Sequence, residues 1–106
     1  MDFEEEVAAA LEDVPAELAA ALQDVAIVVE EENPDEPDIY GWYDGLGPGG
    51  DRAGALPDRI VLYRRPLEEA FPDPRDLRRE IRITVFHEVG HFFGLDEDRI
   101  RELGYG

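Results

Sequence analysis

The chain has 106 residues, 43% of them hydrophobic, which is enough for one domain with a modest core but not for a separate substrate domain. It contains no cysteine, which excludes disulfides and thiolate metal ligands, and its formal charge of −17 disfavours binding to nucleic acid or to anionic membranes. No apolar run approaches the ~20 residues that span a bilayer, and the acidic MDFEEEVAAA start does not resemble a secretory signal, so we expect a cytoplasmic single domain over residues 1–106.

The acidic first part of the chain predicts two short helices and a strand. Apolar residues at helical spacing predict a helix over residues 3–13, which Pro15 interrupts. A second helix over residues 15–23 would bury Leu18, Ala19 and Leu22. The β-branched segment VAIVVEEE (25–32) predicts a strand that is central at its start and exposed at its end.

The middle of the chain predicts a long surface loop and a second strand. Residues 35–58 are rich in proline and glycine, and loops of this length are often functional. Within this loop, Trp42 and Tyr43 either form a lid or anchor the loop to the core. The segment RIVLY (59–63) predicts a strand, and the nearby Pro66 allows an edge position but little continuation inside a sheet.

The last third of the chain predicts a long helix followed by a short one. Asp73 is a candidate N-cap and Pro74 suits the first helical position, so we expect a helix from there to about Phe93. Gly94 favours a C-terminal stop. A final helix, capped by Asp96, would turn Ile100 and Leu103 inward and end at Gly104.

One face of the long helix carries five polar residues, among them the candidates for metal and acid–base chemistry. At about 100° per residue, the polar side chains fall within roughly 100° of arc, while nearly every other direction is apolar. These polar residues are Glu80, Thr84, His87, Glu88 and His91. Because unpaired buried polar groups are costly, this face should line a cleft, with Glu80 and Thr84 as lining groups and Phe92 and Phe93 in the core.

The string HEVGH has the HExxH pattern of zinc-dependent hydrolases. His87 and His91, one helical turn apart, can direct ring nitrogens at one Zn²⁺ ion. Glu88 lies too far round the helix to share that point easily, but it can reach a metal-bound water and act as general base. Amide hydrolysis is the reaction that this chemistry favours.

A catalytic zinc site needs a third protein ligand. Gly94 allows the chain to turn back, so the candidates are Asp96, Glu97 and Asp98. Glu97 ranks first because it lies ten residues after His87, where HExxHxxGxxH enzymes place their third histidine. Asp96 can equally be a helix cap, and Asp98 should face solvent. Beyond the last helix, Tyr105 is a candidate for stabilising an oxyanion.

Three segments resemble a family of small bacterial zincin-like metallopeptidases, or minimal metalloproteases. They are IVLYRRPLE, ITVFHEVGHFFGL and DEDRIRELGY, and the resemblance covers roughly residues 3–105. It implies an α+β zincin-like domain, with helices packed against a small sheet and an edge strand beside the active-site helix, here Ile60–Tyr63. It also implies His87 and His91 as zinc ligands and Glu88 as base, while Glu97 occupies a position where the family typically has aspartate or serine.

Two other zincin groups match less well. Metzincins need a third histidine and a methionine turn, and the chain's one methionine is Met1. Gluzincins place their third ligand much farther downstream.

The leading hypothesis is therefore a zinc-dependent peptidase that acts on a peptide or small protein. The alternatives are a zincin-fold binding module without hydrolytic activity and a metal-dependent hydrolase of another substrate.

Overall fold

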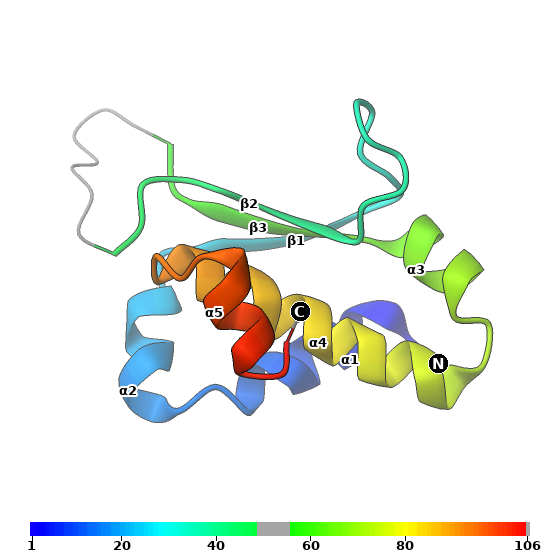
Figure 1. Ribbon diagram of the computed structural model, residues 1–106, viewed down its shortest axis with the longest axis horizontal. Helices are drawn as coiled ribbons and strands as arrows, with labels where there is room; N and C mark the ends of the chain where they lie inside the picture. The colour runs from blue at the N-terminus through cyan, green and yellow to red at the C-terminus, as the bar shows by residue number, and fades with distance from the viewer. Residues whose placement is uncertain (49–55, 106) are drawn as a thin grey trace.

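The computed structural model describes residues 1–48 and 56–105. Its elements are α1 (Phe3–Glu12), α2 (Ala16–Ala19), the 3-10 helix η1 (Ala20–Leu22), β1 (Ala26–Glu30), β2 (Gly41–Asp44), β3 (Arg59–Tyr63), α3 (Arg64–Ala70), α4 (Pro74–Phe92) and α5 (Glu97–Glu102). Helices α1, α2, α4 and α5 lie on the same side of one small sheet (Figure 1). The predicted α+β architecture is confirmed.

Helix α4 carries the HExxH residues and has the boundaries that the sequence predicts. The side chain of Asp73 accepts a hydrogen bond from the backbone N–H of Arg75 at 2.8 Å, and Pro74 is the first helical residue. The helix ends at Phe92, and Gly94 follows with a φ of 86°. Backbone with positive φ is costly for residues with a Cβ, which explains the glycine at this stop.

The sheet has the strand order β1-β3-β2, with β3 parallel to β1 and antiparallel to β2. The prediction of Ile60–Tyr63 as the edge strand is therefore wrong, because β3 is the central strand. Its last four residues are at most 3% exposed, as expected for a strand covered on both faces. Pro66 lies beyond β3 in the first turn of α3, where its missing N–H breaks no ladder bond.

The edge strand beside α4 is β2, inside the segment that we predicted to be a loop. Trp42 pairs with Val61 and Tyr43 with Ile60. Strand β2 has only four residues, with alternating burial, and turn-forming residues lie on both sides of it. A segment this short gives too weak a periodic pattern to predict a strand. At the opposite edge lies β1, which corrects the prediction of a central position for its first residues.

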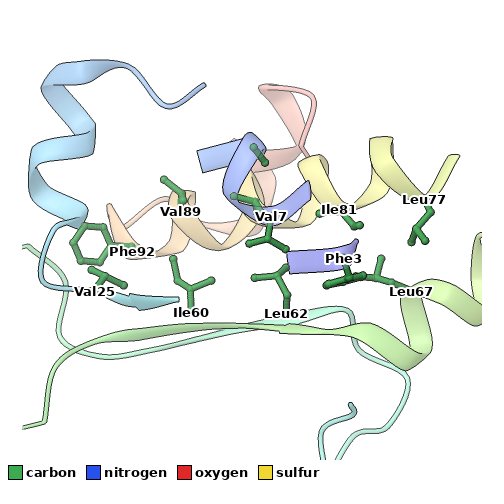
Figure 2. Packing of buried hydrophobic residues seen from close by; sticks show 12 residues of the cluster. Phe3, Val7, Val25, Ile60, Leu62, Leu67, Leu77, Ile81, Val89 and Phe92 are labelled. Carbon is green, nitrogen blue, oxygen red and sulfur yellow. The ribbon is translucent and has the colours of Figure 1, made fainter. Parts of the chain in front are cut away.

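The core lies between the sheet and helices α1 and α4 (Figure 2). Ile60 and Leu62 project from β3 towards Ile81, Val89 and Phe92 of α4 (Figure 2). Phe3 and Val7 of α1 fill the remaining space. A helix held on one side of a packed core is a rigid support for the polar residues on its other side.

Two inward-facing predictions are wrong. Leu18 is 40% exposed and Leu103 is 46% exposed, since the short helix α2 buries none of its residues and α5 buries only Ile100. Helix α3 was not predicted at all. Among the residues that the structure describes, no helix is long and apolar enough to cross a membrane.

Candidate metal centre

Helix α4 and the turn that follows it bring the candidate residues together. His87, Glu88 and His91 project from the C-terminal half of α4, and the chain reverses at Gly94. Helix α5 then begins at Glu97. This residue follows His87 by ten positions in the sequence and lies beside both histidines in the structure.

Three side-chain groups converge on one point. The Nε2 atoms of His87 and His91 are 3.2 Å apart, and Oε1 of Glu97 lies 2.7 Å from the His91 Nε2 and 3.2 Å from the His87 Nε2. One ligand atom from each residue lies within 4.8 Å of the others, which is the spacing of a site that could hold a metal ion. The sequence prediction of this trio therefore agrees with the geometry, and the ligand roles themselves stay a prediction.

Backbone carbonyls fix the orientation of both imidazole rings. His87 Nδ1 lies 3.0 Å from the carbonyl oxygen of Tyr105, and His91 Nδ1 lies 3.1 Å from that of Leu95. A carbonyl oxygen can only accept, so each Nδ1 carries the hydrogen and donates it. In the neutral rings, each Nε2 then presents a lone pair, which is the arrangement that metal-ligating histidines require.

This donor set fits a zinc ion. Two neutral Nε2 atoms and one carboxylate oxygen are all electron-pair donors, so their close approach is favourable when a cation lies among them. Two nitrogens and an oxygen from three residues are also a ligand set of catalytic zinc sites, which keep a fourth position open. The charge and chemistry of the trio thus agree with the ion that the sequence predicts.

The two other candidate acids point elsewhere. Asp96 caps α5, since its side chain accepts from the backbone N–H of Arg99 at 2.8 Å. The side chain of Asp98 is 85% exposed and pairs with Arg101. Burial by itself would raise the pKa of Glu97. In the metal-free protein, hydrogen bonds and positive charge from the His91 and His87 rings in their protonated form outweigh burial and lower this pKa below its ordinary value.

Glu88 differs from Glu97 in its surroundings. Its side chain is buried beside the histidines, and burial raises its pKa above the ordinary value, although the charges of His87 and His91 act in the opposite direction. A carboxyl group with a raised pKa is a stronger proton acceptor once it is ionised, which suits a general base.

The trio and Glu88 line a cleft of about 850 Å³ between β2 and α4. The lining residues are Asp38, Ile39, Tyr40, Gly41, Trp42, Tyr43, Glu80, Ile83, Thr84, His87, Glu88, His91, Glu97 and Tyr105. The predicted cleft on the polar face of α4 is therefore present, and Glu80 and Thr84 line it as expected. Thr84 is buried and donates its hydroxyl to the carbonyl oxygen of Glu80 at 2.8 Å.

Trp42 and Tyr43 of the predicted loop belong to a paired strand rather than to a lid. Trp42 lies 48% exposed at the cleft. Tyr43 anchors the strand, because its hydroxyl donates to the buried carboxylate of Asp58 at 2.6 Å and its ring packs edge-on against Phe92. Phe92 is buried and Phe93 packs against the core, as predicted.

Sequence reasoning missed the backbone carbonyls of Leu95 and Tyr105 that hold the two histidines. A carbonyl contact depends on the path of the chain and not on the residue type, so no side-chain pattern reveals it. The one local signal is Gly104, whose φ of 93° turns the chain so that Tyr105 reaches His87. The Tyr105 ring packs against Phe86, and its role at an oxyanion stays a prediction.

Comparison with known proteins places the motif in a wider context. The model of one protein family, described as zincin-like metallopeptidase, matches residues 5–106. A search of curated proteins found no match to the chain.

Proposed function

The chain belongs to the zincin-like metallopeptidase family, and from this premise we propose that it hydrolyses peptide bonds with a zinc ion held by His87, His91 and Glu97. The observation that carries the proposal is the convergence of these three donors beside the buried Glu88, inside a cleft. A structural zinc site would have four protein ligands, whereas three ligands and an open position are typical of catalysis.

Each residue has a defined part in the proposed reaction. Zinc, when bound, polarises the substrate carbonyl and makes a nearby water more acidic. Glu88 accepts a proton from the attacking water and then donates it to the leaving amine. Its buried position favours both steps, since the raised pKa lets the carboxyl group hold the proton between them.

Strand β2 supports a peptide as the substrate. One edge of β2 pairs with β3, and no other strand of the described residues pairs with its second edge. This second edge could therefore accept a further strand. An extended peptide can add to such an edge through backbone hydrogen bonds. Because Gly41 of β2 lies against Thr84 and Glu88, a peptide on this strand would pass over the centre.

The charge of the cleft favours peptides with basic side chains. The lining includes Asp38 and Glu80 in addition to Glu88 and Glu97, and no arginine is among the described lining residues. Like charges repel and opposite charges steer encounters, so acidic peptides should be poor substrates.

The test combines zinc binding with cleavage. Wild type, Glu88→Gln and the control Glu102→Gln, whose carboxylate pairs with Arg99 on α5, are loaded with one equivalent of zinc. Cleavage of a mixed peptide library is then followed by mass spectrometry. We expect zinc binding in all three proteins and cleavage in all but Glu88→Gln. A wild-type protein that binds no zinc refutes the proposal, and one that binds zinc but cleaves nothing favours the alternative of a binding module.

A further inference from the structure

The segment from Leu95 to Tyr105 supplies three separate contacts to the candidate centre. Its side chain at Glu97 provides the third donor, and its backbone carbonyls at Leu95 and Tyr105 hold the rings of His91 and His87. The geometry of the centre therefore depends on where this segment rests against α4. Only the positions of the two histidines along α4 are set by that helix itself.

A single side chain anchors α5. Ile100 is the one buried residue of this helix, all of whose residues are described, and it is 1% exposed. It packs against Gly90 of α4, which lies between the two histidines in sequence and is also buried. A Cβ placed on Gly90 would lie 2.9 Å from Cγ1 and 3.1 Å from Cδ1 of Ile100. The glycine thus forms a notch that receives Ile100.

Local backbone conformation does not explain this glycine. Gly90 lies inside α4 and is not among the described glycines with positive φ, which are Gly47, Gly94 and Gly104. Glycine is a poor residue for a helix interior, so alanine here would favour the helix itself. The feature that alanine would disturb is the contact with α5.

We propose that Gly90 and Ile100 are positioning residues for the metal centre, because their contact sets the distance of Glu97 from His87 and His91. This inference rests on the metal site proposed above. Carbon atoms in contact normally lie about 3.5–4.0 Å apart, so a methyl group at Gly90 would push α5 outward by roughly 0.6 Å or more. Metal–ligand distances tolerate only about ±0.2 Å, so the shift would misplace Glu97.

A double-mutant cycle tests the proposal. Zinc affinity is measured by competition with a chromogenic chelator for wild type, Gly90→Ala, Ile100→Ala and the double variant. Ile100→Ala removes both atoms that would meet the new methyl group. We expect Gly90→Ala to weaken zinc binding about tenfold or more, as for other groups that orient metal ligands, and to have less than about a twofold effect in the Ile100→Ala background.

Ile81→Val serves as the matched control, because it trims a fully buried residue of α4 two turns before the site. Its zinc affinity should equal that of wild type. Equal affinities of wild type and Gly90→Ala would overturn the inference. An equal loss in both Ile100 backgrounds, or a similar loss in Ile81→Val, would overturn it as well, since the effect would not depend on the contact.

A measurement without metal separates this inference from the proposed function. The amides of Ile100 and Leu103 are hydrogen-bonded to Asp96 and Arg99 within α5 and its caps. We expect their hydrogen exchange in the metal-free protein to be faster in Gly90→Ala than in wild type, and unchanged in Ile81→Val. If wild type binds no zinc, the proposed function fails, and these exchange rates still decide whether Gly90 and Ile100 position α5. Identical exchange in Gly90→Ala and wild type would show that they do not.

Discussion

Replacing Glu97 gives the most direct measure of the third donor. Glu97→Gln keeps the size of the side chain but removes its charge, so a zinc ion would have only a neutral, weaker amide oxygen in place of the carboxylate. We expect zinc affinity to fall at least about 100-fold, which corresponds to roughly 2.8 kcal/mol. The same substitution at Glu102, on the same helix but paired with Arg99, should leave the affinity unchanged.

A shorter side chain tests the distance as well as the charge. Glu97→Asp keeps the carboxylate but withdraws it by about one C–C bond, roughly 1.5 Å. In the present structure the carboxylate lies 2.7 Å and 3.2 Å from the two Nε2 atoms, so this retreat exceeds the tolerance of about ±0.2 Å for a zinc ligand. Affinity should therefore fall between those of wild type and Glu97→Gln, unless α5 moves inward.

Competition titration with a chelator at pH 7.5 measures all of these variants, with Asp98→Asn as a second control. Zinc affinity of Glu97→Gln within threefold of wild type would refute Glu97 as a ligand. A loss in Asp98→Asn instead would indicate that α5 turns on binding and presents the neighbouring acid.

Three further predictions concern the base, the edge strand and its anchor. Burial raises the pKa of Glu88, so the stability that its protonated form provides is present below the ordinary value of 4.5 and is lost as pH rises through the raised pKa. Metal-free Glu88→Gln should then be more stable than wild type at pH 7, by about 1.4 kcal/mol for each unit by which the pKa of Glu88 is raised, and no more stable at pH 4. Urea unfolding measures the difference, and a difference that does not change with pH would contradict this prediction. Gly41→Ala would place its Cβ 2.8 Å from Cγ2 of Thr84 and 3.2 Å from Oε2 of Glu88, so we expect peptide cleavage to fall with little change in zinc affinity. A parallel loss of cleavage and zinc affinity would show instead that the substitution disturbs the metal ligands. Tyr43→Phe removes a 2.6 Å hydrogen bond to buried Asp58 and should lower the free energy of unfolding by about 1.5–3 kcal/mol, with an effect under 0.5 kcal/mol counting against a role for this bond.

The sequence predicts α4 well because the helix is specified locally. Its N-cap, its first-position proline, its apolar period and its terminal glycine all lie within or beside the helix, so no distant contact is needed to find its ends. The polar stripe follows directly, since helix geometry alone places His87, Glu88 and His91 on one face. For the same reason, the two histidines were the safest part of the predicted site.

The sheet was harder to predict because strand order is not a local property. The four apolar residues of β3 before α3 indicate a central strand, but Pro66 suggested an edge, and only the structure shows that this proline belongs to the next helix. Strand β2 has just four residues, and it exists because Trp42 and Tyr43 pair across to β3. Such a strand depends on its partner more than on its own residues.

The third donor lies between these two cases. Glycine at position 94 and the cap at Asp96 predict where α5 begins, and both are local, but the distance between Glu97 and the histidines depends on the packing of Ile100 against Gly90. If zinc binds as proposed, docking of α5 and zinc affinity are parts of one equilibrium, because a docked α5 would offer three ligands and an undocked α5 only two. Once the undocked form dominates, each loss of about 1.4 kcal/mol in the free energy of docking would weaken zinc binding tenfold. Residues that do not touch the ion would in this way control its affinity.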